Sequence, residues 1–363
     1  MSPLPLHELH AAIGGVFGEL NGAELVAHYA DPPAEGIALH ATAAALDLSF
    51  RSRVCVLGAD RVKFLNGQVT NHVAALKTGE GCYATLVTAK GKVQSDLNIF
   101  ALADELLLDF EPGRTRLVTE RLEKYVIADD AQLVDVAPHY GLLSVQGPRA
   151  ADVVVRLGLE MELPKILRAV ATITDPTLGV LYLMNLPRAG APGFDLYVPV
   201  AALGAVFDKL IAATKAVGGC ASGWQALETA RIEAGIPRFG ADIDETNLPS
   251  EAGIEATAVS YTKGCYIGQE VIARLRTYGN VARALRGLRL AESLPALPAR
   301  GAKLFKDGKE VGHVTSAVAS PALHANLALG YERREANHIG TEITLRASAG
   351  ESVVRIVALP FRG

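Results

Sequence analysis

Hydrophobic positions in the first 30 residues recur every three or four places. Leu6, Leu9, Ile13 and Val16 follow this spacing, which predicts a helix that ends at the prolines of positions 32 and 33. From about residue 51 the pattern changes to short apolar runs separated by turn residues. We therefore expect a helical N-terminus followed by a mixed α+β region.

Residues 51–139 are expected to alternate strands with two helices. The apolar run 54–57 is predicted to be a strand, and Asp60 is placed to cap the helix that follows. Residues 83–88 and 93–100 are predicted to pair as a hairpin, followed by a strand over 105–110, a helix over 115–127 and a strand over 132–136. This order approximates β-α-β-β-α-β, the ferredoxin-like arrangement.

Residues 142–217 follow a similar order. Strands are predicted over 142–145, 180–186 and 194–200, and helices over 148–157 and 201–217. Beyond Arg283, short apolar strands separated by glycine, proline and asparagine turns predict a small β-barrel or sandwich. We place the linker before this last part at residues 278–280.

Composition narrows the class of protein. The chain has 363 residues, 50% of them hydrophobic, and a net charge of −4. This balance argues against a basic nucleic-acid-binding protein and against a disordered polyanion. The sequence has no apolar stretch of the roughly 18 residues that a membrane span needs, and its N-terminus lacks the basic segment of a signal peptide. We expect a cytoplasmic protein.

Several common chemistries lack their motifs in this sequence. It contains no P-loop, no dinucleotide-binding glycine fingerprint, no GxSxG elbow and no HExxH. The four cysteines are far apart, which fits neither a disulfide framework nor a structural zinc site. We therefore expect no protein-bound metal ion.

Residues 263–274 carry the most specific candidate chemistry. Gly264 and Gly268 frame Cys265, and Lys263 stands two residues before the cysteine. A nearby cation favours the thiolate, which is the nucleophilic form. The alternative is that Cys265 is a small buried hydrophobe. The other polar and aromatic residues of this motif loop are Tyr266, Gln269, Glu270 and Arg274.

Two predicted strands carry polar side chains on one face. Gln94, Asp96 and Asn98 alternate with apolar residues and share a face, for which an ordinary solvated sheet surface is the alternative. Asp195 and Tyr197 share a face of the other strand. A carboxylate beside an aromatic ring suits a flat heterocycle with adjacent N–H donors, such as a pterin.

Arginines are the remaining candidate ligands. Arg231 is expected near the C-terminal end of a helix over 224–234, where it can complement the helix dipole or contact a ligand. A cluster between 274 and 289 can meet a ligand's carboxylate tail, the phosphates of RNA, or solvent alone. Its members are Arg274, Arg276, Arg283, Arg286 and Arg289.

These residues resemble a known family. The octet at 263–270 is similar to the KGCY-x-GQE motif of the folate-binding YgfZ family, relatives of the T-protein (aminomethyltransferase) of the glycine cleavage system. Blocks shared by both groups appear in order at 46–49, 58–61, 64–71, 231–235, 248–253 and 311–316. The octet is specific for the YgfZ family, whereas the other blocks place the superfamily.

The resemblance implies an α+β fold of three domains in a ring around a central folate cavity. Two domains are ferredoxin-like and the third is a C-terminal β-barrel. The first, folate-binding domain is expected to be discontinuous, over residues 1–50 and 140–280. The second is expected over 51–139 and the barrel over 281–363.

The resemblance also implies a function and its residues. Tetrahydrofolate, or a one-carbon-substituted folate, is the expected cofactor, and assembly or repair of iron–sulfur clusters, including those of tRNA-modifying enzymes, is the expected role. Asp195 matches the acidic residue that grips the pterin, Arg231 a folate-site arginine, and Asp96 a segment with paired aspartates in the T-protein. Cys265, activated by Lys263, is expected to open into the same cavity as Asp195. Tyr197, Gln94 and Asn98 are expected to line the folate site.

Two departures from the T-protein favour the YgfZ-like interpretation. Ser95 stands in place of one of the paired aspartates, and the octet cysteine is foreign to the T-protein. A folate-dependent aminomethyltransferase with Asp96 as acid/base residue remains the alternative, so whether the chain is an enzyme stays open. A second alternative is an RNA- or protein-binding module without folate chemistry. The expected partners are folate and iron–sulfur cluster proteins, with any nucleic-acid contact indirect and the chain a monomer.

Overall fold

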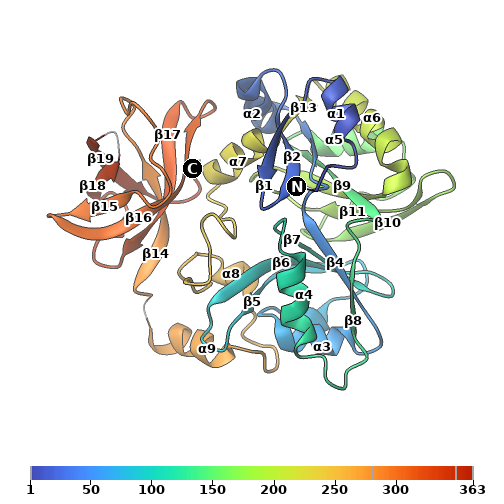
Figure 1. The fold of residues 1–363 in the computed structure, drawn as a ribbon, viewed down its shortest axis with the longest axis horizontal. Coiled ribbons are helices and arrows are strands. Elements are labelled where there is room, and N and C mark those ends of the chain that lie inside the picture. Colours follow the sequence, from blue (N-terminus) through green and yellow to red (C-terminus); the bar gives the residue numbers. More distant parts are fainter. Residues whose placement is uncertain (1, 280, 348–349, 362–363) are drawn as a thin grey trace.

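The computed structural model describes residues 2–279, 281–347 and 350–361, so Asn280 of the expected linker lies outside the described residues. Its strands form an N-terminal hairpin, two larger sheets and a closed barrel (Figure 1). Helices of the described chain are all too short or too polar to cross a membrane.

The N-terminal segment corrects our expectation of one helix. The short helix α1 (His7–Ala12) is followed by the antiparallel strands β1 (Val16–Leu20) and β2 (Ala23–His28). The turn residues Asn21 and Gly22 both have positive φ, 53° and 83°. An Asn-Gly pair is typical of two-residue hairpin turns, and here it overrides the helical spacing of the apolar residues. The two prolines begin α2 (Pro32–Ala41) instead of ending a helix.

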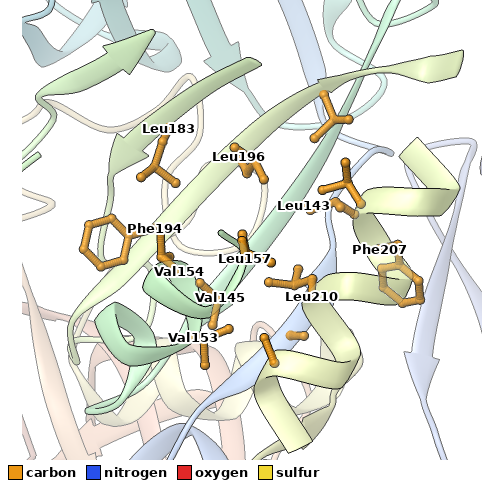
Figure 2. Close-up of a cluster of buried hydrophobic side chains, with 14 of the residues drawn as sticks. Leu143, Val145, Val153, Val154, Leu157, Leu183, Phe194, Leu196, Phe207 and Leu210 are labelled. Atoms are coloured by element: carbon orange, nitrogen blue, oxygen red, sulfur yellow. The ribbon is translucent and has the colours of Figure 1, made fainter. Parts of the chain in front are cut away.

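The first large sheet has the order β10-β11-β12-β9-β3-β13. These strands are β10 (Val170–Asp175), β11 (Gly179–Asn185), β12 (Gly193–Pro199), β9 (Tyr140–Gln146), β3 (Ala44–Asp47) and β13 (Cys220–Ala221). The helices α5 (Ala150–Arg156) and α6 (Val200–Ala216) pack on the sheet. Figure 2 shows the apolar side chains between them, among them Leu143, Val145, Leu196, Val153 and Phe207.

The second sheet has the order β5-β6-β7-β4-β8. Its strands are β5 (Gly81–Val87), β6 (Val93–Ala101), β7 (Leu106–Phe110), β4 (Ser52–Leu57) and β8 (Gln132–Asp135), and its helices are α3 (Arg61–Gln68) and α4 (Thr115–Glu123). The part β8-β4-β7-β6 has the order of a ferredoxin-like unit, to which β5 adds an edge strand. Because β3 and β9 belong to the first sheet, the second sheet is an insertion between them. On the basis of this sheet membership, we propose that residues 1–50 and 140–280 form the first domain, residues 51–139 the second and residues 281–363 the barrel.

The C-terminal part is a closed barrel of order β14-β17-β16-β15-β18-β19. Its strands are β14 (Arg283–Arg289), β15 (Lys303–Lys306), β16 (Lys309–Ser320), β17 (Ala325–Arg333), β18 (Glu342–Ala347) and β19 (Gly350–Val357). Leu288, Val314, Leu345 and Ile356 fill its interior. The expected small β-barrel is therefore confirmed.

The helix α7 (Trp224–Glu233) lies between the first sheet and the barrel (Figure 1). One end of it leads into the irregular segment 234–254, which runs toward the second sheet. The short helices η1 (Val73–Ala75) and α8 (Glu255–Ala258) and the longer α9 (Gln269–Tyr278) lie beside that sheet. The three parts of the molecule thus surround α7 and the segment after it.

Candidate functional site

A cavity of about 350 Å³ lies between the two sheets and α7. This volume is typical of small-molecule sites, which run from about 300 to 1,000 Å³. Apolar walls come from Leu186, Trp224, Leu227 and Ile254. The charged lining residues are Arg51, Asp96, Glu111, Arg168, Arg188, Glu228, Arg231 and Arg238. The cavity therefore combines an apolar surface for a ring with many charged groups.

Most of these charges belong to one chain of ion pairs in which acids and arginines alternate. Its order is Asp195, Arg188, Asp109, Arg51, Glu111, Arg238, Glu228, Arg231 and Asp242. The N–O distance is 2.6 Å between Arg188 and Asp195 and 2.7 Å between Arg51 and Asp109. Burial alone would raise the pKa of Asp109, but Arg188 and Arg51 hold it well below its usual range. Each buried charge is thus offset by its neighbours.

Asp96 lies outside this chain of ion pairs. The Tyr83 hydroxyl donates to its Oδ2 at 2.8 Å, and among the described residues no cation forms an ion pair with it. Burial, together with the negative charge of Glu111, raises the pKa of Asp96 to about 6. A carboxyl group with that pKa exchanges its proton near neutral pH, as general acid/base catalysis requires. Asp96 lines the cavity, and its role at a folate site stays a prediction.

Asp195 does not line the cavity. It is fully buried, its Oδ1 accepts from the Ser144 hydroxyl at 2.7 Å, and its Oδ2 accepts from Nε and Nη2 of Arg188 at 2.8 and 2.6 Å. Arg188 therefore stands where a ligand would have to approach the carboxylate. The expectation that Asp195 and Cys265 open into one cavity is wrong, because neither residue lines it.

The other three sheet residues predicted for the folate site lie in different surroundings. Asn98 lines the cavity, accepting from Arg168 Nε at 3.1 Å and donating to Asp109 at 3.2 Å. Gln94 turns away and accepts from Arg121 of α4 at 2.9 Å. Tyr197 is buried behind the cavity wall, and its hydroxyl has no hydrogen-bond partner among the described residues. Only Asn98 of these three has a direct route to a ligand.

Arg231 lines the cavity and also joins α7 to the barrel. Its guanidinium is paired with Glu228 and Asp242, and its Nη2 donates to Ser316 of β16 at 2.9 Å. Asp242 in turn accepts from the Thr315 hydroxyl at 2.5 Å. Arg231 is therefore a structural residue at the wall of the cavity, and complementing the helix dipole is not its main role.

Lys263 and Cys265 point to different surroundings. The Lys263 ammonium is buried and donates to the carbonyl oxygens of Asn66, Val69 (2.6 Å) and Asn71 (2.9 Å), at the C-terminal end of α3. Burial lowers the pKa of Lys263 to about 8. Cys265 is exposed, so the alternative of a buried hydrophobe is wrong. Because Lys263 is held by carbonyl oxygens, its expected role as activator of the thiol has no support in these contacts.

The rest of the motif loop fixes the start of α9. Gly268 has φ of 84°, and a Cβ at this position would lie 2.4 Å from the Thr88 carbonyl oxygen. Tyr266 is buried, with its ring 4.8 Å from the Lys263 ammonium. Gln269 begins the helix, and Glu270 and Arg274 form an exposed ion pair along it. A Cβ added at Gly264 would have no atom within 4 Å. The loop is thus anchored on both sides of an exposed cysteine.

Most of the five arginines between positions 274 and 289 are held by other groups of the chain. Arg276 stacks on Tyr261, Arg283 pairs with Glu251, and Arg286 donates to the Asn337 carbonyl oxygen. Within the described part of the chain there is also no group of three or more side chains that could hold a metal ion. The contacts of these arginines give no support to a nucleic-acid site.

Sequence reasoning missed most of the charged cavity lining. Arg51, Arg168 and Arg188 lie in loops or at strand ends, and Glu111 follows β7. Most of their partners are far away along the chain: Arg51 and Asp109 are 58 positions apart, and Arg188 and Asp109 are 79 positions apart, although Arg188 also pairs with Asp195, which is 7 positions away. No local pattern identifies such residues, whereas Arg231, which the resemblance singled out, lines the cavity.

Comparison with known proteins identifies the fold. The crystal structure of glycine cleavage system aminomethyltransferase T from Bartonella henselae matches with a TM-score of 0.87 and 25% identity, over 99% of this chain and 98% of that one. This match confirms the expected α+β fold with a C-terminal barrel. The aminomethyltransferases of Halalkalibacterium halodurans and Symbiobacterium thermophilum are 29% and 28% identical, over 98% of this chain and 97% and 96% of theirs.

Family models agree over most of the chain. The GCVT N-terminal domain matches residues 6–263, and the glycine cleavage T-protein C-terminal barrel domain matches residues 283–362. The two matches appear in the same order as the sheets and the barrel of the structure. The chain therefore belongs to the family of the glycine cleavage T-protein.

Proposed function

We propose that the chain binds tetrahydrofolate, or a one-carbon-substituted form of it, in the central cavity and acts in aminomethyl transfer of the T-protein type. The observation that carries this proposal is Asp96, a cavity carboxyl group with a pKa of about 6, in a chain of this family. Aminomethyltransferases of the family use tetrahydrofolate, which accepts the one-carbon unit when bound. The alternative function predicted from the sequence thus has better support than an iron–sulfur role.

The cavity residues fit such a ligand. Trp224, Leu227 and Ile254 offer apolar surface to a flat ring, and Glu111 and Glu228 offer carboxylate acceptors for ring N–H groups. Arginine side chains at the other walls can meet the carboxylates of the glutamate portion. The residues present therefore match both the ring and the acidic end of a folate.

Asp96 is the residue that would move a proton. Tyr83 holds Oδ2 of Asp96, whereas no described residue donates to Oδ1. The free oxygen can hold a proton below pH 6 or accept one above it, and either state is reached with little free energy. Asp96 would thereby assist departure of the leaving group and orient the amine that receives the one-carbon unit.

The test is turnover. We expect formation of methylene-tetrahydrofolate from an aminomethyl-lipoyl substrate, and an Asp96→Asn variant should lose at least 100-fold of that rate, in line with roughly 10²–10⁴-fold for general acid/base groups. Asp152→Asn, at an exposed ion pair on α5, is the matched control and should keep the rate. Absence of turnover by the wild type with substrate in excess would contradict the proposal.

A second candidate function is supported by Cys265. This exposed thiol sits in the octet that resembles the YgfZ family, between the buried anchors Lys263 and Tyr266. In this alternative the chain is a cytoplasmic, monomeric, folate-binding member of the YgfZ family, which acts on iron–sulfur cluster proteins through the cysteine. The anchored loop supports the presentation of a thiol to a partner, not chemistry inside the cavity.

This alternative predicts that substitution of Cys265 affects the activity of iron–sulfur enzymes but not the affinity for folate. Cys265→Ser should leave tetrahydrofolate affinity unchanged and lower the activity of iron–sulfur enzymes in cells. Cys220→Ser, at a half-buried cysteine elsewhere in the chain, should change neither quantity. Unaltered activity of cluster enzymes with Cys265→Ser would remove the thiol from the mechanism.

A further inference from the structure

Arg168 differs from the other arginines of the cavity. Arg51, Arg188, Arg231 and Arg238 are each paired with carboxylates. Arg168 forms an ion pair with no carboxylate of the described residues. Burial lowers the pKa of Arg168, and the titratable groups that act on it are the phenol of Tyr83, the thiol of Cys82 and the guanidinium of Arg188, none of which is a carboxylate. A half-buried cation therefore faces the cavity without a counter-ion.

Contacts with neighbouring side chains hold the guanidinium of Arg168 on one side and leave its other side free. Its Nε donates to Oδ1 of Asn98 at 3.1 Å, and its Cζ lies 5.4 Å from the centre of the Tyr83 ring. Nη1 and Nη2 donate to no described residue. The two contacts fix the plane of the guanidinium and leave its double N–H edge open, which is the edge that binds a carboxylate in a bidentate manner.

The backbone at this position is unfavourable for a long side chain. Arg168 has φ of 63°, a region that asparagine and glycine tolerate better than arginine. Neighbouring backbone packs closely around this position. The N–H of Arg168 donates to the Asn185 carbonyl oxygen at 2.7 Å, and a Cβ added at Gly81 would lie 2.8 Å from the carbonyl oxygen of Arg168. Backbone strain of this kind concentrates at functional sites. The fold itself therefore gives no reason for an arginine here.

We propose that Arg168 binds a carboxylate of the ligand in the central cavity through Nη1 and Nη2. This inference rests on the proposed function and adds to it the residue that recognises the anionic end of the ligand. The carboxylate can belong to the glutamate portion of a folate or to a separate small carboxylate that shares the cavity with the pteridine. Both sources present the same chemistry to the guanidinium.

Calorimetric titrations separate the two sources. Wild type and Arg168→Gln are titrated with tetrahydrofolate, with 6-methyltetrahydropterin, which has the ring but no carboxylate, and with glycine after saturation with 6-methyltetrahydropterin. If the glutamate portion is bound, the variant loses at least tenfold affinity for tetrahydrofolate and stays within twofold for 6-methyltetrahydropterin. If a separate carboxylate is bound, both pteridines stay within twofold and glycine binding is lost.

Further variants distinguish recognition from folding. Arg168→Asn suits the positive φ, so it should unfold at or above the wild-type temperature while showing the same loss of carboxylate binding. Arg116→Gln removes an equal charge from an exposed position on α4 and should change no affinity. An equal effect of Arg168→Gln on tetrahydrofolate and 6-methyltetrahydropterin, or no effect on any of the three ligands, would overturn the inference. Failure of the wild type to bind either pteridine would overturn the proposed function first, and this inference with it.

Discussion

At the scale of single residues, the site is defined by how each buried charge is compensated. Asp109 is held between Arg51 and Arg188, and its pKa falls. Asp96 has no such partner, and its pKa rises to about 6. The same physical cost of burial thus produces a permanent anion at one position and a titrating group at the other.

Asp96→Asn is expected to stabilise the protein at neutral pH. The folded state raises the pKa of Asp96 from 3.8 to about 6, so it binds this proton more tightly than the unfolded state does. The stabilisation from the protonated carboxyl is complete below about pH 4 and is lost as the pH rises through 6. The variant should therefore gain about 1–2 kcal/mol at pH 7.5, with the partial exposure of Asp96 taken into account, and almost nothing at pH 4. Urea unfolding at both pH values measures this, and a variant less stable than the wild type at pH 7.5 would contradict it.

Gly268→Ala is expected to destabilise the motif loop by about 1–3 kcal/mol. Its φ of 84° is unfavourable for alanine, and the added Cβ would meet the Thr88 carbonyl oxygen at 2.4 Å. Gly264→Ala is the matched control four residues away, because a Cβ there has no atom within 4 Å, and it should change stability by no more than about 0.5 kcal/mol. Equal effects of the two substitutions in thermal unfolding would show that the turn tolerates a side chain.

At the scale of elements, local patterns predicted the sheets better than the site. The alternation of Val93, Ser95 and Leu97 with polar residues placed β6 correctly and put Asp96 on its accessible face. The helix expected at the N-terminus ends at Ala12, and a hairpin follows it because the Asn21-Gly22 turn outweighs apolar spacing. The sequence predicts Lys263 as a partner of Cys265, but the acceptors of its ammonium are backbone carbonyls more than 190 positions away, which no local pattern predicts.

Arg231→Met is expected to loosen α7 from the barrel. The substitution leaves Asp242 buried without its cation and removes the bond to Ser316, so the free energy of unfolding should fall by about 3–5 kcal/mol. Arg116→Met, which breaks an ion pair whose arginine side chain is 87% exposed, should cost no more than about 1 kcal/mol. Urea unfolding of both variants checks the difference, and similar costs would mean that Arg231 does not hold the two elements together.

At the scale of the whole molecule, the cavity exists only when three distant parts of the chain come together. Tyr83 and Asp96 come from the second sheet, Arg188 from a loop of the first, and Trp224 and Arg231 from α7. Family resemblance predicted a central cavity, whereas the chain of ion pairs around it depends on tertiary contacts alone. Asp195 shows this limit: its strand was predicted, but its ion pair with Arg188, and so its removal from the cavity surface, was not.

The most direct test of the cavity as a folate site uses its own tryptophan. Trp224 is the only tryptophan of the chain, and it lines the cavity with its ring 5.2 Å from the Arg238 guanidinium carbon. Titration with tetrahydrofolate should change Trp224 emission in a saturable way with one ligand per chain, after correction with N-acetyltryptophanamide for absorption by the ligand. Absence of any change, or calorimetric binding that leaves the emission unaltered, would contradict the assignment of the cavity.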